Sequence, residues 1–470
     1  MPGAWATKKK NAVVNPPEPV CFKRQPHVSD QAEVGNPVRV NAALLKTTDC
    51  AVPFYHPSLA TQAAGLRDQV PSLLQLVCLG ALTEDAPGEA LEAFSSRSSV
   101  ACPEPVDDPD RVETIFPTGG TTGLSKAALW SQRTWGSAIK AFWICLPTDG
   151  PSVHLVAASM THAAGVVALM MMCEGTTNVI LPSASAGSIL EAIQTHRVTH
   201  LYLPPTAVYN LLAHPCVLDY DYSSLRCLVL AAAPVGPNKL REAMDVFGAV
   251  VCQSFGQAEA PMFVTFLFTR DLLGDPSRTG PGRWASCGRA TLGQRVAILD
   301  SAGSILPPGH RGEIVVRGDL VFPGYCKNPD ATRAVSTFGW HHTGDVGYMD
   351  SEGFVYIVGR MKDMIITGGF NVFSAEVEQV VGGHPAVEDC AVIGAPDPKW
   401  GEAVTAVVQL REGQTVSASE LISLVREQLG PVHAPKAVDF MKELPRSPNG
   451  KVLKTEIRAR YWQGRERTVG

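Results

Sequence analysis

The residue types best suited to chemistry stand together in one short stretch, residues 118–126 (TGGTTGLSK). Its glycines let the backbone turn tightly and bring N–H groups close to an anion, while its hydroxyl groups and lysine add donors and positive charge. Such a loop suits a polyphosphate. The Walker pattern has glycine directly before lysine, whereas Leu124 and Ser125 separate Gly123 from Lys126. A standard P-loop NTPase is therefore disfavoured, and a flexible surface loop is the structural alternative.

Four further groups of glycine, hydroxyl, acidic and basic residues follow this loop. They occupy residues 254–259 (SFGQAE), 343–345 (TGD), 359–371 (GRMKDMIITGGFN) and 445–451 (PRSPNGK). Together with the loop, in this order, they resemble the adenylate-forming superfamily, and within it the acyl-CoA synthetase branch of AMP-dependent acid:CoA ligases. The resemblance spans about residues 41–460 and implies an enzyme that binds ATP.

The resemblance implies nucleotide or CoA binding for most of these residues. Phe255 would stack on adenine, since a flat apolar ring suits a purine. Asp345 would accept hydrogen bonds from the ribose hydroxyls, since a carboxylate can receive two donors. Small residues before Pro234 would let the backbone approach adenine. The full implied set is Thr118, Gly119, Gly120, Thr121, Thr122, Gly123, Lys126, Ala232, Ala233, Pro234, Phe255, Gly256, Gln257, Asp345, Arg360, Lys362, Gly368 and Gly369.

Three residues match catalytic positions of the family. Glu259 matches the acid that helps to hold Mg²⁺, with Thr118 as a second metal ligand, because this hard cation prefers oxygen. Lys451 matches the C-terminal lysine whose ammonium stabilises the attacking carboxylate and the charge developing on the α-phosphate, and Lys454 is a weaker candidate. His162 matches a helix-start position that faces the acyl group, with a merely structural histidine as the alternative.

The chain departs from the family pattern in two places. The family normally has threonine before the metal-binding acid, and Ala258 stands there instead, so we expect weakened but not abolished ATP binding. Only 117 residues precede the loop, fewer than in relatives. Residues 44–82 look like the strand, helix and strand that precede the loop in the family, but nothing matches earlier elements. The resemblance therefore implies a large domain that is short at its N-terminus.

The family works by rotating a small C-terminal domain after adenylation, which implies a hinge at Lys362. Arg360 would contact the nucleotide beside this hinge. Gly368 and Gly369 would line the path of the pantetheine arm, because a residue without a side chain leaves room there. A tight turn between two strands is the alternative explanation for these glycines.

The expected activity is ATP- and Mg²⁺-dependent conversion of a carboxylic acid to an acyl-adenylate, followed by transfer to CoA. Amino-acid-activating members of the family place an aspartate near His162 to pair the substrate ammonium, and residues 160–165 contain no acidic residue, so the resemblance implies an acid without an α-amine. The implied pocket residues are small and apolar, which suits an aliphatic or aromatic acid. Transfer to a carrier protein is one alternative. An impaired nucleotide-binding or scaffold protein, motivated by Ala258 and the short N-terminus, is another.

Composition restricts the class of protein. At 470 residues, 45% hydrophobic and 18% charged, the chain is expected to be a globular protein of two or three domains. A net charge of −5 and a pI near 6.2 give no electrostatic signature of nucleic-acid binding. The 12 cysteines contain no Cys-x-x-Cys pair, which favours a reducing, cytoplasmic setting. No apolar run is long enough to cross a bilayer, and we expect a monomer or homodimer.

The pattern of apolar residues predicts the elements that position these groups. Alternating strands and helices predict an α/β fold built on a parallel sheet. The expected elements are strands at 154–158, 178–181, 199–203 and 226–231, and helices at 188–196, 206–213 and 237–247. Hairpin-like strands at 296–300, 313–317 and 354–358 predict a small barrel-like antiparallel subdomain.

A third unit is predicted to be a small mobile α+β domain. Its expected elements are strands at 390–393, 404–410 and 438–441 and a helix at 418–429. The expected domain division is an irregular, proline-rich lead-in at 1–40, a large AMP-binding domain at 41–361 and a mobile domain at 362–470.

Overall fold

A computed structural model of the chain describes residues 29–30, 37–97, 106–118, 126–146, 148–181, 184–273, 283–446 and 452–463. The chain divides into two compact units, one of residues 1–27 and 49–108, the other of residues 28–48 and 109–470. The first unit contains a three-stranded parallel sheet with a core of Tyr55, Ala63, Leu76 and Cys78. Its elements are β2 (Phe54–Tyr55), α2 (Ala60–Gln69), β3 (Val77–Cys78), β4 (Glu89–Ala90) and α3 (Leu91–Ser96). The expected strand, helix and strand before the loop are therefore present as β2, α2 and β3.

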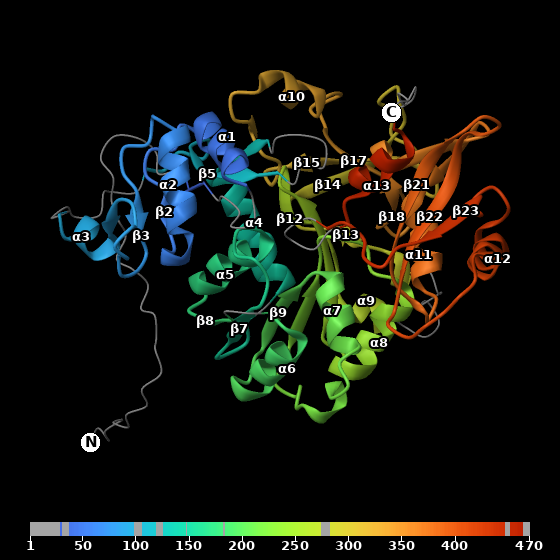
Figure 1. The fold of residues 1–470 in the computed structure, drawn as a ribbon, viewed down its shortest axis with the longest axis horizontal. Coiled ribbons are helices and arrows are strands. Elements are labelled where there is room, and N and C mark those ends of the chain that lie inside the picture. The colour runs from blue at the N-terminus through green and yellow to red at the C-terminus, as the bar shows by residue number, and fades with distance from the viewer. Residues whose placement is uncertain are drawn as a thin grey trace. The chain divides into compact units, whose positions relative to one another are not determined.

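The second unit is built on a long sheet whose first half is parallel, with strand order β8-β7-β9-β10-β11. Figure 1 shows helices α5 to α8 packed along these strands. The strands are β7 (Val153–Val156), β8 (Thr177–Ile180), β9 (His200–Leu203), β10 (Cys227–Leu230) and β11 (Val251–Gln257). The helices are α4 (Gln132–Cys145), α5 (Ala163–Cys173), α6 (Ala186–Thr195), α7 (Pro205–Leu212) and α8 (Pro237–Phe247). The predicted alternation of strand and helix is confirmed.

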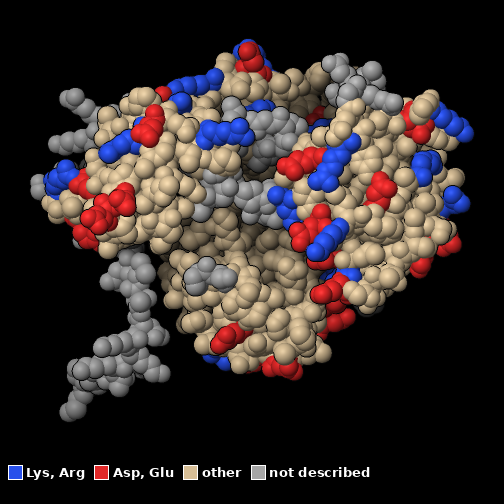
Figure 2. Space-filling model, viewed as in Figure 1, with Lys and Arg blue, Asp and Glu red and all other residues tan. Residues whose placement is uncertain are grey.

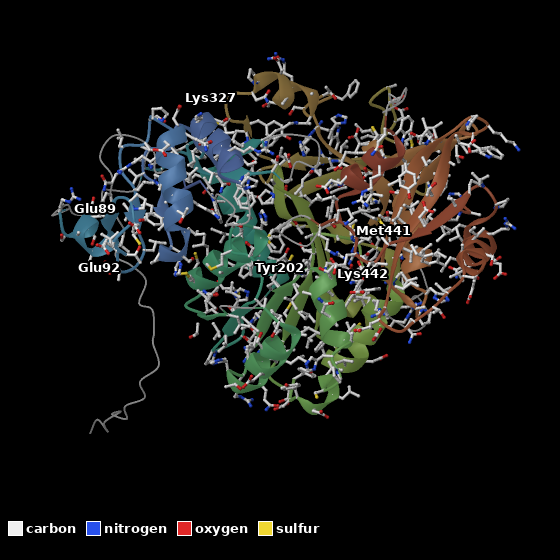
Figure 3. The ribbon with its side chains drawn as sticks, in the orientation of Figure 1. Glu89, Glu92, Tyr202, Lys327, Met441 and Lys442 are labelled. Atoms are coloured by element: carbon white, nitrogen blue, oxygen red, sulfur yellow. The ribbon has the colours of Figure 1, made fainter. Side chains whose placement is uncertain are left out.

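The central parallel strands β9 and β10 are buried on both faces. Tyr202 on β9, labelled in Figure 3, packs with Val229 and Cys252 into a core that includes residues of α4 and α5. The alternate residues, such as Leu201 and Leu228, pack with residues of α6, α7 and α8. Because both faces are covered, these strands are nearly continuous runs of apolar residues, and this is why they can be predicted from sequence.

Local signals set the ends of the helices. Ser131 caps the start of α4, and its hydroxyl accepts the Thr134 N–H at 3.2 Å. Pro237 occupies the first turn of α8, and Gly248 follows its last residue with a φ of 88°. Proline at the start and glycine just past the end are typical of helix boundaries, and α8 has the bounds that the sequence predicts.

The second half of the long sheet is antiparallel and continuous with the first. It adds β12, β13, β18, β17, β15 and β14 in that order after β11. These strands are β12 (Ala260–Leu267), β13 (Gly288–Ala290), β14 (Gln294–Leu299), β15 (Gly312–Gly318), β17 (His341–Met349) and β18 (Phe354–Arg360). The predicted antiparallel subdomain is thus joined to the parallel strands by the pairing of β11 with β12 and of β12 with β13.

A smaller sheet joins the segment near the N-terminus to the start of the large domain. Its order is β1 (Ser29–Asp30), β5 (Val112–Pro117), β6 (Ala127–Ser131) and β16 (Gly324–Tyr325). The lead-in predicted to be irregular over 1–40 therefore contains a paired strand, and α1 (Val38–Thr48) already begins before residue 41. The prediction was wrong at these positions because a two-residue strand has no sequence period and is fixed only by its partner β5.

The C-terminal region forms a five-stranded sheet with order β20-β19-β22-β21, in which β23 also pairs with β22. Its strands are β19 (Met364–Thr367), β20 (Phe370–Phe373), β21 (Val387–Asp397), β22 (Gly401–Leu410) and β23 (Ala437–Phe440). Its helices are α11 (Ser374–Gly382), α12 (Ala418–Leu429) and α13 (Lys454–Tyr461). The predicted α+β character is confirmed, and α12 has its predicted bounds. The division at residue 362 remains a prediction.

Figure 2 shows acidic and basic side chains interspersed on the face it draws. Within the described ranges, no helix combines the length and the apolar character that a bilayer span requires.

A buried histidine predicts how the stability depends on pH. His154 on β7 is 1% exposed, and its Nδ1 lies 2.7 Å from Asn178 Oδ1. Burial lowers the pKa of His154 from 6.5 to about 4, opposed by the hydrogen bond to Asn178. The unfolded chain therefore binds this proton first as the pH falls. The contribution of His154 to stability is full above pH 6.5 and is lost progressively as the pH falls towards 4.

We expect His154 to account for a loss of about 2 kcal/mol of unfolding free energy between pH 7 and pH 5. Urea unfolding of wild type and of His154→Gln at both pH values measures this loss, because glutamine does not titrate. The fall in urea midpoint should be smaller in the variant. An equal fall in the two proteins would show that His154 does not carry the effect.

Candidate functional site

The predicted phosphate loop connects the antiparallel strands β5 and β6, which pair as a β-hairpin. The Thr118 N–H donates to the Lys126 carbonyl at 2.8 Å, and the Lys126 N–H donates to Thr118 Oγ1 at 3.2 Å. These two bonds close the base of the loop. The predicted loop residues Gly119, Gly120, Thr121, Thr122 and Gly123 lie outside the described residues.

Phe255, Gly256 and Gln257 form the end of β11, and Ala258 and Glu259 make the turn into β12. A Cβ on Gly256 would lie 2.4 Å from the backbone nitrogen of Met262, so only glycine fits here. The register shifts between Phe255 and Gln257, as in a β-bulge. This bulge explains the glycine in the sequence and brings the acidic residue to the tip of the turn.

Contacts from distant segments hold the turn between β11 and β12. Trp130 Nε1 on β6 donates to the Ala258 carbonyl at 2.7 Å. The Tyr325 hydroxyl on β16 donates to Glu259 Oε1 at 2.6 Å. The Lys126 ammonium lies over the ring of Tyr325, 4.7 Å from its centroid. The structure therefore brings the two predicted site residues Glu259 and Lys126 together around one tyrosine.

The alanine segment expected to face adenine follows β10 directly. Leu230 at the end of β10 pairs with Gln253 of the parallel neighbour β11, so the segments after both residues lie at the same edge of the sheet. Ala232, Ala233 and Pro234 are exposed there. Ala232 adopts a φ of 75°, a left-handed conformation that costs energy for a residue with a Cβ. Ligand sites of parallel sheets lie at this carboxyl edge.

Asp345 on β17 is buried, with 6% of its surface exposed. Burial raises the pKa of Asp345, and the charge of Arg360 opposes this rise. Arg360 Nε lies 3.3 Å from Asp345 Oδ1, and the two residues are paired across β17 and β18. Two predicted nucleotide contacts thus meet in one ion pair, beside the exposed hinge candidate Lys362.

The segment that carries Asp345 is fixed by Glu313 on β15. Glu313 Oε1 accepts the Gly344 N–H at 3.1 Å, and its Oε2 lies 2.7 Å from His342 Nδ1. Gly344 has a φ of 72°, which favours glycine. Glu313 therefore holds the part of β17 that presents Asp345.

Gln257, expected to bind the nucleotide, is engaged with the protein in this structure. Its Nε2 lies 2.9 Å from Nε2 of the buried His341. Burial lowers the pKa of His341 to about 4, with the charge of His342 adding to the effect. The ring is therefore neutral near pH 7 and can accept the amide hydrogen bond. This contact ties the end of β11 to the start of β17.

Gly368 and Gly369 form the two-residue turn between β19 and β20, with φ values of 56° and 83°. A Cβ on Gly368 would lie 2.8 Å from the ring of Trp400. Turn geometry alone thus accounts for both glycines, as the structural alternative requires. Their role in passing a pantetheine arm stays a prediction.

His162 precedes the first residue of α5, where the sequence places it. Its ring lies 6.3 Å from that of Phe116, which stacks on Trp130 at 4.6 Å. Since Trp130 also donates to Ala258, a continuous row of rings leads from His162 to the turn that carries Glu259. A role for His162 towards an acyl group stays a prediction.

Lys451 lies outside the described residues, whereas Lys454 is visible at the start of α13. Lys454 Nζ donates to Ser374 Oγ at 3.0 Å and to a carboxylate oxygen of Glu378 at 2.8 Å. Both partners belong to α11 of the same small domain. Lys454 therefore ties α13 to α11, which leaves Lys451 as the catalytic candidate.

Sequence reasoning missed three residues of this site, namely Trp130, Glu313 and Tyr325. Each acts through a contact with a segment far away in the chain, such as the Trp130 bond to Ala258. Spacing within one segment carries no signal for such contacts. The glycine before Tyr325 was the one local indication of a special backbone position, with a φ of 150° in the structure.

Comparisons with known proteins agree with this arrangement. The model of the AMP-binding enzyme family matches residues 39–326, and that of the AMP-binding enzyme C-terminal domain matches residues 376–451. The chain is 38% identical over 431 residues to a medium/long-chain-fatty-acid–CoA ligase of Mycobacterium tuberculosis, covering 88% of this chain and 73% of that protein. It is 36% identical to a feruloyl-CoA synthase of an Amycolatopsis species, covering 87% and 82%. The structure of ATP-bound MatB from Rhodopseudomonas palustris superposes with a TM-score of 0.81 at 28% identity, covering 92% and 83%.

Proposed function

Because the chain belongs to the family of AMP-binding enzymes, we propose that it activates a carboxylic acid with ATP and transfers the acyl group to CoA. The carboxylate attacks the α-phosphorus, the acyl–oxygen–phosphorus bond forms, and pyrophosphate leaves. The CoA thiol then attacks the acyl carbon of the adenylate, and AMP leaves with the bonding electron pair. The products are acyl-CoA, AMP and pyrophosphate.

One observation carries this proposal: three separate nucleotide motifs converge around β11. The alanine segment follows its parallel neighbour β10, and Glu259 stands at its own turn. The phosphate-loop lysine reaches Tyr325, the tyrosine that donates to Glu259. A purine, its phosphates and a cation are the ligand chemistry that such a set of groups fits.

The residues present fit a magnesium ion bound together with ATP. Among the described residues, no group of three His, Cys, Asp or Glu side chains could hold a metal by itself. Mg²⁺ is commonly held by one or two carboxylates together with substrate phosphates, and Glu259 with Thr118 supplies that kind of oxygen set. When bound, the ion would offset the charge of the phosphates.

The chain's own residues do the remaining work. Asp345 would hold the ribose through its carboxylate once Arg360 is displaced or shared, and Lys126 would offset phosphate charge. Ala258 contributes its carbonyl to Trp130, an interaction that does not need the hydroxyl of the usual threonine. The fixed backbone of this turn supports an active enzyme rather than an impaired one.

We propose a medium- or long-chain fatty acid or an aromatic acid as the substrate, since two of the relatives are named for such acids. Pyrophosphate release from wild type over fatty acids and hydroxycinnamic acids, with and without CoA, tests this. We expect acid-dependent pyrophosphate release and, with CoA present, acyl-CoA detected by mass spectrometry. ATP binding with no pyrophosphate release for any acid would contradict the activity, and acyl-adenylate without acyl-CoA would point to a carrier protein as the acceptor.

A further inference from the structure

Tyr325 makes two contacts that no other described side chain combines. It is 7% exposed, and its hydroxyl donates to Glu259 Oε1 at 2.6 Å. Its ring lies beneath the Lys126 ammonium, 4.7 Å away. A single side chain thus connects the carboxylate at the tip of the β11–β12 turn with the last residue of the phosphate loop.

The surroundings of Tyr325 allow its side chain little freedom. Its backbone pairs with Ala128 on β6, and its N–H donates to Thr332 Oγ1 at 2.9 Å. The ring of Phe322 packs against it edge-on, with centroids 4.8 Å apart. The Phe322 N–H in turn donates to the Glu259 carbonyl at 2.8 Å. Glu259 is therefore held through its side chain by Tyr325 and through its backbone by Phe322.

We propose that Tyr325 is a positioning residue, which orients the Glu259 carboxylate for a divalent cation and the Lys126 ammonium for the phosphates of the nucleotide. With Oε1 fixed by the phenol, the carboxylate stops rotating and Oε2 keeps one direction. The negative face of the ring restrains the ammonium without neutralising it. This inference rests on the proposed function and extends it to a residue that no sequence motif marks.

The geometry of the contact suits this role, because the Tyr325 hydroxyl donates to Glu259 Oε1 and leaves Oε2 for a cation. A carboxylate that accepts a hydrogen bond from a fixed donor is also the usual arrangement around bound metal ions.

The test compares two buried tyrosines that each donate a hydrogen bond to a carboxylate. Tyr325→Phe removes the hydroxyl and keeps the ring below Lys126. Tyr356→Phe is the matched control, because the buried Tyr356 also donates to a carboxylate, Asp350 Oδ2 at 3.1 Å, on strands away from the loop. The measurement is the rise in melting temperature produced by ATP, titrated with Mg²⁺ and repeated in EDTA, which needs no turnover.

We expect Tyr325→Phe to need about 10- to 100-fold more Mg²⁺ for the half-maximal shift, with ATP binding in EDTA unchanged. Tyr325→Leu should in addition weaken ATP binding in EDTA by about 2- to 5-fold, because the cation–π contact is lost. Tyr356→Phe should leave both values unchanged. In a Glu259→Gln background, Tyr325→Phe should not raise the Mg²⁺ requirement further, because the charge that Tyr325 would orient for the cation is gone.

Three outcomes would overturn the inference. They are an unchanged Mg²⁺ requirement in Tyr325→Phe, equal shifts in Tyr325→Phe and Tyr356→Phe, and loss of folding in Tyr325→Phe, which would make Tyr325 a core residue. Failure of the proposed function would look different. No acid would then yield an adenylate in wild type, while the Mg²⁺ titration of ATP binding would still separate the two tyrosines.

Discussion

Lys451→Ala is expected to lower the rate of acyl-adenylate formation by about 10²- to 10³-fold while preformed acyl-adenylate still reacts with CoA. The lysine would stabilise charge on the attacking carboxylate and the α-phosphate, and that charge develops only in the first half-reaction. Pyrophosphate exchange measures the first step. Release of AMP from synthetic acyl-adenylate and CoA measures the second.

The structure supplies a matched control for this experiment in Lys454→Ala. Lys454 lies three residues further on and is engaged by Ser374 and Glu378 within its own domain. Its removal should lower the melting temperature and change pyrophosphate exchange by less than about 10-fold. The assignment of Lys451 as the catalytic lysine would be wrong if Lys451→Ala slowed both half-reactions equally. It would also be wrong if Lys454→Ala had the larger effect on pyrophosphate exchange.

Glu259→Gln is the second change with a large expected effect. Glutamine keeps the volume and one oxygen acceptor for Tyr325 but removes the charge that a divalent cation requires. We expect adenylate formation to fall by about 10²-fold or more, with a raised Mg²⁺ requirement and little change in the KM of the acid. Initial rates of pyrophosphate release at varied Mg²⁺ measure this.

Asp350→Asn is the control for Glu259→Gln. The Asp350 carboxylate also accepts a tyrosine hydroxyl, that of Tyr356, but its other partners are the backbone N–H groups of Glu352 and Phe354 in a hairpin turn. Its neutralisation should affect stability and leave the Mg²⁺ requirement unchanged. A similar rise in Mg²⁺ requirement in both variants would show a general loss of rigidity instead of a role at the metal.

The central strands of the parallel half, β9 and β10, could be predicted from sequence because they are covered on both faces. Leu201 and Tyr202 pack on opposite sides of β9, so the residues of β9 after His200 form an apolar run that ends at Pro204. Helices α8 and α12 could be predicted because proline, serine and glycine mark their ends. In these places the local signal and the tertiary environment agree.

Other elements depend on partners that are distant in sequence. β1 has two residues and exists through its pairing with β5, and α13 carries mostly polar residues around the single buried Ile457. Motif residues such as Glu259 and Asp345 could be named because the family resemblance marks them. Tyr325 and Glu313 could not, because each is defined by the group it holds and not by its own neighbours in sequence.

The pairing of β16 with β6 has a consequence for the order in which the protein gains activity during synthesis. Tyr325 is made almost 200 residues after its strand partner Ala128, and Asp345 later still. A ribosome-bound chain that has completed β7 to β11 would already hold a packed parallel sheet, yet Glu259 and Lys126 would lack the side chain that connects them. Nucleotide affinity should therefore appear late and abruptly as the chain lengthens, because these contacts join the most distant segments of the site.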